Sequence, residues 1–78
     1  MMEVDGVKEL LETRLKGAKV EAVDLTGTFD HFEVRVEWVE FKGKSLIQQH
    51  QLVNKALEDA LEDGRIHALK IKTVIPKN

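Results

Sequence analysis

Apolar and charged residues alternate strictly between positions 32 and 38. This period of two predicts a β-strand with one buried face and one solvated face. The apolar positions are Phe32, Val34, Val36 and Trp38, and the charged positions are Glu33, Arg35 and Glu37. His31 directly precedes this run, and by the same alternation it lies on the charged face.

Near the start of the chain, apolar residues recur every three or four positions, which predicts an amphipathic helix. Its apolar positions are Val4, Val7, Leu11 and Leu15. Asp5 is placed to cap the start of this helix, and Gly17 is placed to end it. A strand from Lys19 to Thr26 follows, and the segment Gly27-Thr28-Phe29-Asp30 predicts the turn of a hairpin.

A second helical pattern predicts one long helix between Ser45 and Gly64. Ser45, with Gln48 three residues later, forms a capping-box pattern at its start. The apolar stripe of this helix consists of Leu46, Val53, Leu57 and Leu61, with His50 between them. We therefore expect His50 to pack in the core.

A last strand is expected from Ile66 to Ile75, with Leu69 and Ile71 facing the core and Lys70 and Lys72 facing solvent. The element order is then helix, strand, strand, helix, strand. A long helix that joins two strands of one sheet makes those strands parallel, through a right-handed crossover. We expect a single α+β domain over residues 1–78, with a three-stranded mixed sheet and both helices packed on one face.

The composition indicates a cytoplasmic protein without membrane association. The chain has 78 residues, no cysteine and a formal net charge of −2, and a third of its residues are charged. The lack of cysteine fits a reducing compartment. No apolar run approaches the roughly 20 residues that span a bilayer, and the acidic, mixed N-terminal segment is unlike a signal peptide.

Catalytic motifs are absent from the sequence, so we expect no enzyme activity. There is no cysteine nucleophile, and the only serine, Ser45, is explained by its helix cap. No glycine-rich phosphate loop occurs. Nucleic-acid binding has only a slight basis, because the loop Lys42-Gly43-Lys44 carries two cations and the chain as a whole is acidic.

The three histidines are the remaining candidates for chemistry. His31 is expected at the exposed edge of the hairpin turn. His67 has the same parity as Leu69, which predicts a half-buried, hydrogen-bonded histidine at a strand end. No two of them have short metal-ligand spacing, and a complete zinc site needs three or four ligands. Two histidines would supply only part of a metal site, and a partner would bring the rest; a site for a lone divalent metal is the alternative.

Three segments together resemble the BolA-like family over nearly the whole chain, in its cysteine-free, IbaG-like branch. They are the hairpin at residues 23–34, the loop and helix start at residues 41–53, and the Ile66-His67-Ala68 stretch with the strand that follows it. The resemblance implies a KH-like (class II) α-β-β-α-β fold, in agreement with the element order derived from the pattern.

The resemblance also implies a function. BolA-like proteins pair with monothiol glutaredoxins of the Cys-Gly-Phe-Ser type and share a [2Fe-2S] cluster with them, using a glutathione thiol carried by the partner. Carried over to this chain, His67 is the metal ligand. His31 is the second ligand, on condition that its imidazole lies close to that of His67. The protein would be a monomer alone and a heterodimer with the glutaredoxin, acting in cluster trafficking or iron sensing.

The alternative function is that of a KH-like transcriptional regulator that binds nucleic acid through Lys42 and Lys44. Many family members have Arg-His-Arg in the long helix, where this chain has Gln49-His50-Gln51. The loss of two cations weakens this alternative. The distance between the imidazoles of His31 and His67 is the observation that tests the paired-ligand prediction.

Overall fold

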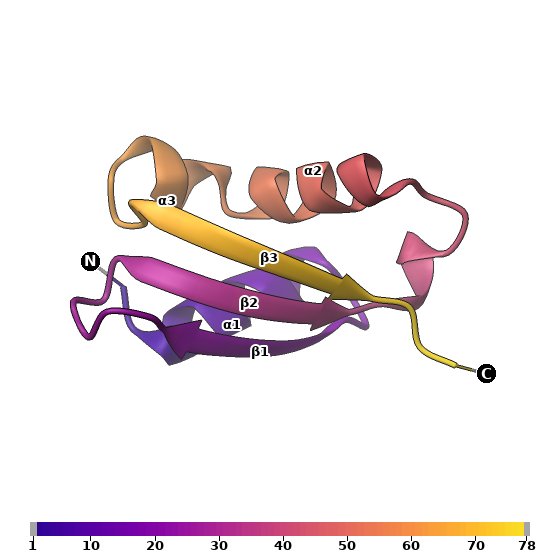
Figure 1. Ribbon diagram of the computed structural model, residues 1–78, viewed down its shortest axis with the longest axis horizontal. Coiled ribbons are helices and arrows are strands. Elements are labelled where there is room, and N and C mark those ends of the chain that lie inside the picture. The colour runs from indigo at the N-terminus through magenta and orange to yellow at the C-terminus, as the bar shows by residue number, and fades with distance from the viewer. Residues whose placement is uncertain (1, 78) are drawn as a thin grey trace.

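The sheet has three strands, with β2 in the centre (Figure 1). The computed structural model describes residues 2–77. β1 (Lys19–Asp24) pairs antiparallel with β2 (His31–Glu37), and β2 pairs parallel with β3 (Ala68–Val74). The mixed sheet predicted from the element order is therefore confirmed.

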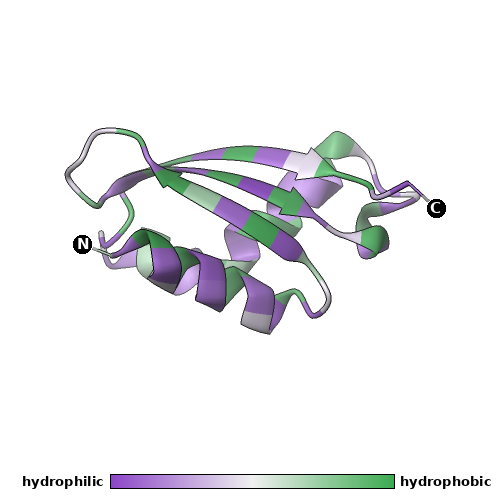
Figure 2. Cartoon of the chain, turned by 90° about the horizontal axis from the view of Figure 1, so that it is seen from below, coloured by the Kyte–Doolittle hydropathy of each residue, from purple (hydrophilic) through white to green (hydrophobic). Residues whose placement is uncertain are grey.

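The helices cover one face of this sheet, as Figure 2 shows. They are α1 (Val4–Arg14), α2 (Leu46–Ala56) and α3 (Glu58–Glu62), and a short 3-10 turn, η1 (Val39–Phe41), follows β2. α1 packs against β1, and α2 packs against β3 and α1. No helix within residues 2–77 is long and apolar enough to cross a membrane.

The alternation along β2 produces the centre of the core. Phe32, Val34 and Val36 are fully buried against the helices, while His31 and the charged positions of this strand are partly exposed on the open face. Figure 2 shows the same alternation as bands of opposite hydropathy along the strands. The predicted faces of this strand are therefore correct.

The start of α1 differs from the prediction. The helix begins at Val4, and the residue before it, Glu3, makes no side-chain capping bond. Asp5 therefore does not cap the helix. It lies within the first turn, where a carboxylate is favoured by the helix dipole. The apolar face is as predicted, with Val7 and Leu11 fully buried.

The predicted long helix is broken at Leu57. The capping box of Ser45 and Gln48 is present at its start, as the sequence indicates. Leu57, however, has φ −109° and ψ 13°, and its amide donates to both Val53 and Asn54 carbonyls, which tightens the helix end. The chain then resumes as α3, and the break leaves both Leu57 and Ala60 fully buried.

The expectation that His50 packs in the core is wrong, because the buried face of α2 keeps Val53 but is shifted towards Gln49 and Ala56. Gln49, Val53 and Ala56 are its buried residues, at the i, i+4, i+7 spacing of one helical face. His50 is only partly buried, and Leu46 is 62% exposed. The Gln49 amide is satisfied by donating to the Lys44 carbonyl and accepting from the Thr73 hydroxyl on β3.

Candidate functional site

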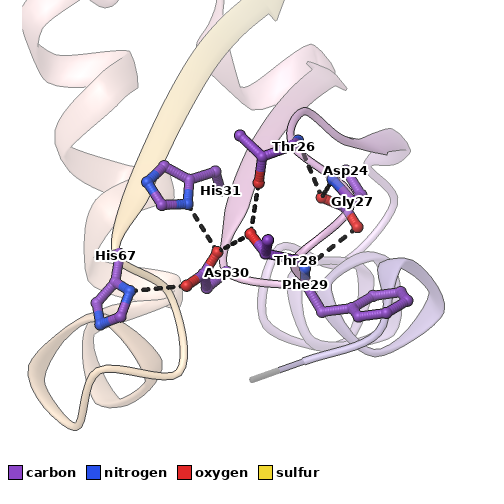
Figure 3. Close-up of polar contacts among 8 residues, drawn as sticks. All are labelled: Asp24, Thr26, Gly27, Thr28, Phe29, Asp30, His31 and His67. Atoms are coloured by element: carbon purple, nitrogen blue, oxygen red, sulfur yellow. Dashed lines mark hydrogen bonds and ion pairs between the residues drawn. The ribbon is translucent and has the colours of Figure 1, made fainter.

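The hairpin loop between β1 and β2 is ordered by one carboxylate, that of Asp24 (Figure 3). β1 ends at this residue, two positions earlier than predicted. The carboxylate accepts hydrogen bonds from the backbone N–H groups of Thr26, Gly27 and Phe29 at 3.0–3.3 Å. Gly27 and Phe29 have φ values of 76° and 61°. The loop therefore contains two residues in the left-handed region. The Asp24 side chain accepts from the N–H groups of both, and also from that of Thr26.

Parallel pairing of β2 with β3 brings His31 and His67 to the same end of the sheet. His31 starts β2 opposite Ala68, the first residue of β3. The backbone N–H groups of His67 and Ala68 both donate to the Asp30 carbonyl, at 2.7 and 3.3 Å. The two imidazole centroids lie 6.1 Å apart, at an interplanar angle of 64°. These two residues, called the histidine pair below, are thus neighbours, as the paired-ligand prediction requires.

The Asp30 carboxylate lies between the two rings, as Figure 3 shows. Its Oδ1 is 2.7 Å from Nδ1 of His31, and its Oδ2 is 2.8 Å from Nδ1 of His67. The Thr28 hydroxyl also donates to Oδ1. Hydrogen bonds from Thr28, and then from His31 and His67, hold the pKa of the Asp30 carboxyl well below its ordinary value of 3.8, against the opposing effect of burial.

Both rings are accessible from solvent. The side chain of His67 is 62% exposed and that of His31 is 40% exposed. His67 is therefore not the half-buried residue that strand parity predicted. It precedes β3, and the fully buried neighbour is Ile66. Gly64, at φ 83°, faces Nε2 of His67, and a Cβ there would lie 3.8 Å from this nitrogen.

The depressed pKa of Asp30 predicts where acid removes its contribution to stability. The folded state binds this proton less tightly than the unfolded chain, in which aspartate titrates near 3.8. The contribution is therefore complete above 3.8 and is lost as the pH falls from there through the folded-state pKa. Thermal unfolding between pH 5 and pH 2 should show Asp30→Asn less stable than the unchanged chain at pH 5, with the gap closing only below 3.8.

Thr28→Val sharpens this measurement, because the Thr28 hydroxyl makes the largest contribution to the shift. In that background the gap caused by Asp30→Asn should close at a higher pH, nearer to 3.8. A gap that stays constant down to pH 2, or no gap at pH 5, would contradict the assigned cause.

The structure does not bring the other candidates to this site. His50 lies on α2, outside the histidine pair. Lys42 and Lys44 lie in the loop beyond the far end of β2, and Lys44 donates to the Glu40 carbonyl at 3.0 Å. Within residues 2–77, no group of three or more His, Cys, Asp and Glu side chains is arranged to hold a metal ion. Two histidines alone are fewer than the three or four ligands that a complete zinc site needs.

Asp30 and Thr28 are site residues that the sequence interpretation assigned only to a turn. Asp30 precedes His31, so that contact has a local signal in the sequence. Its contact with His67 joins residues 37 positions apart. That contact depends on the register between β2 and β3, which no pattern in the sequence specifies.

The comparisons with known proteins agree on one family. Residues 7–78 match the model of a family described as BolA-like protein. The chain is 38% identical over 73 residues to protein BOLA2 of Arabidopsis thaliana, covering 92% of this chain and 76% of the relative. It is also similar to the structure of a bolA protein homologue from Coxiella burnetii, with a TM-score of 0.81, 34% identity, and coverage of 97% of this chain and 94% of that one. The BolA domain of SufE1 from Arabidopsis thaliana matches with a TM-score of 0.80 and 33% identity, covering 94% of this chain and 91% of that one.

Proposed function

This chain belongs to the BolA-like family, and from that membership we propose that it is a non-enzymatic adaptor for iron–sulfur clusters. In this role it shares a [2Fe-2S] cluster, as cargo, with a monothiol glutaredoxin of the Cys-Gly-Phe-Ser type. The observation that carries the proposal is the histidine pair. His31 and His67 come from separate strand ends, yet their rings lie 6.1 Å apart, and both are exposed where a partner can reach them.

The donor set supports a shared cluster rather than one held by this chain alone. Iron–sulfur clusters are held by four ligands, most often cysteine thiolates, and histidines replace cysteines on one iron in Rieske centres. This chain has no cysteine, and its site offers two imidazoles. The partner glutaredoxin cysteine and a glutathione thiol would supply the remaining ligands.

Assembly of the complex under anaerobic conditions tests the proposal. The protein is mixed with a monothiol glutaredoxin, glutathione, iron and sulfide, and the cluster in the heteromeric complex is followed by visible absorption and circular dichroism. His67→Ala should abolish the heteromeric spectrum, because a ligand is lost. His50→Ala is the matched control, since it removes an imidazole from α2, and it should leave the spectrum unchanged.

An unchanged spectrum for His67→Ala would refute the proposal. The competing site for a lone divalent metal is distinguished by titrating the isolated protein with zinc. Two protein ligands fall short of the three or four that zinc sites use, so we expect weak binding. A dissociation constant below 1 μM that is lost on replacing His31 or His67 would favour the lone-metal site instead.

A further inference from the structure

One carboxylate contacts both members of the histidine pair. Asp30 Oδ1 and Oδ2 are within 2.7 and 2.8 Å of the Nδ1 atoms of His31 and His67, respectively. The same residue also holds His67 through the main chain, because its carbonyl accepts from the His67 N–H at 2.7 Å. Asp30 therefore fixes His67 at two points and His31 at one.

These contacts have a consequence for the proton on each ring. An ionised carboxylate can only accept hydrogen bonds, and a neutral imidazole has one N–H donor and one accepting nitrogen. Each Nδ1 that faces Asp30 must therefore carry its proton, and each Nε2 has the free lone pair. Figure 3 shows both rings turning Nε2 away from the carboxylate.

We propose that Asp30 is a positioning residue that sets both imidazoles as Nδ1–H tautomers and presents their Nε2 atoms as the ligating atoms. The last part rests on the proposed function; the tautomers do not. Histidines that bind metals commonly donate their other N–H to a carboxylate, which fixes the ring and raises its basicity as a ligand. Here a single carboxylate serves two rings.

A role of Asp30 in loop order alone is the competing explanation. Asp24 already satisfies the backbone N–H groups of the hairpin loop. The side chain of Asp30 instead accepts from the Thr28 hydroxyl and from the two imidazoles. The two aspartates lie at opposite ends of one loop and have different partners, so Asp24→Asn is a matched control for Asp30→Asn.

The test is the tautomeric state of each histidine in the isolated protein, without metal or partner. Long-range ¹H–¹⁵N correlation spectra of ¹⁵N-histidine-labelled protein are recorded at pH 8.5, above the ordinary histidine pKa of about 6.5. In the unchanged protein, His31 and His67 should both be Nδ1–H tautomers. The amide introduced by Asp30→Asn has one accepting oxygen and one donating NH₂ group, so at least one of the two rings should convert to Nε2–H.

Asp24→Asn should leave both tautomers as they are, since its partners are backbone N–H groups. Three results would each overturn the proposal: an Nε2–H tautomer at His31 or His67 in the unchanged protein, both rings still Nδ1–H in Asp30→Asn, or an equal conversion in Asp24→Asn. The first of these needs no variant to fold.

Cluster assembly then separates this inference from the proposed function. With the glutaredoxin present, Asp30→Asn should weaken formation of the cluster-bound complex by about 10–100-fold, the usual cost of losing such a carboxylate partner. If the tautomers are as proposed and no heteromeric cluster forms with the unchanged protein, the proposed function fails and the role of Asp30 in setting the tautomers stands. If the cluster forms and the tautomers differ, only the role of Asp30 fails.

Discussion

Replacing Phe32 with alanine should lower the free energy of unfolding by about 3–5 kcal/mol, the usual cost of deleting a buried phenylalanine ring. Phe32 is fully buried at the centre of the sheet, where the core side of β2 meets the helices. A small domain has a total stability of only about 0.05–0.15 kcal/mol per residue. For a domain of 78 residues this is about 4–12 kcal/mol in total. The variant should therefore lose at least a quarter of its stability and unfold at a clearly lower urea concentration at 25 °C, as measured by urea denaturation followed by circular dichroism.

Phe29→Ala is the matched control for this prediction. It deletes the same ring from a residue that is 42% exposed in the hairpin loop. Phe29 has φ 61°, and alanine has a Cβ as well, so the substitution leaves the backbone preference nearly unchanged. The loss should stay below about 1 kcal/mol. Similar losses for the two variants would show that Phe32 is not the centre of the core.

The strand that carries Phe32 could be predicted from the sequence because its signal is local. Alternation with a period of two fixes which side chains share a face, and the structure places them accordingly. The capping box of Ser45 and Gln48 is also a local signal, since its partners are three residues apart. The order of elements then predicted a mixed sheet, because a helical crossover makes the joined strands parallel, but the central place of β2 comes from the structure.

The errors in the prediction have a common physical cause: periodicity gives a face but not its exact rotation or its limits. On α2, polar Gln49 takes the buried position that the apolar stripe assigned to His50, because its amide finds partners at Lys44 and Thr73. At His67 the parity count fails because β3 begins only at Ala68, two residues after the predicted start at Ile66. The break at Leu57, which leaves Leu57 and Ala60 both buried, has no signal in the sequence pattern.

The candidate site also has a part that the sequence predicts and a part that only the structure shows. His31 and His67 were identified from the sequence, and their proximity follows from parallel pairing of the strands that they precede or begin. The role of Asp30 needs the register of that pairing and the conformation of the loop. A polar residue beside a candidate ligand is common in any sequence, and only the structure shows that this one accepts from both rings.

The second large effect is expected at Gln49. It tests whether Gln49 faces the core, as in the structure, or His50 does, as the sequence pattern predicts. Gln49 is 8% exposed, and its side chain joins the Lys44 carbonyl to the Thr73 hydroxyl. Gln49→Ala removes two partly buried hydrogen bonds, each worth about 0.5–1.5 kcal/mol, so the loss should be about 1–3 kcal/mol. His50→Ala, on the neighbouring and partly exposed position, should cost less than about 1 kcal/mol.

Thr73→Val, alone and combined with Gln49→Ala, isolates the bond between α2 and β3. Each single variant strands a polar partner, whereas the double variant removes both groups, so the double loss should be smaller than the sum of the two single losses. Urea denaturation of the four proteins gives the coupling free energy. If His50→Ala costs more than Gln49→Ala, the helix faces the sheet with its apolar stripe, as the sequence pattern alone predicts. If the losses of Gln49→Ala and Thr73→Val add without coupling, the bond between these two side chains does not contribute to stability. If they couple, a polar bond between α2 and β3 stabilises the observed rotation of the helix, at the opposite end of β3 from the histidine pair.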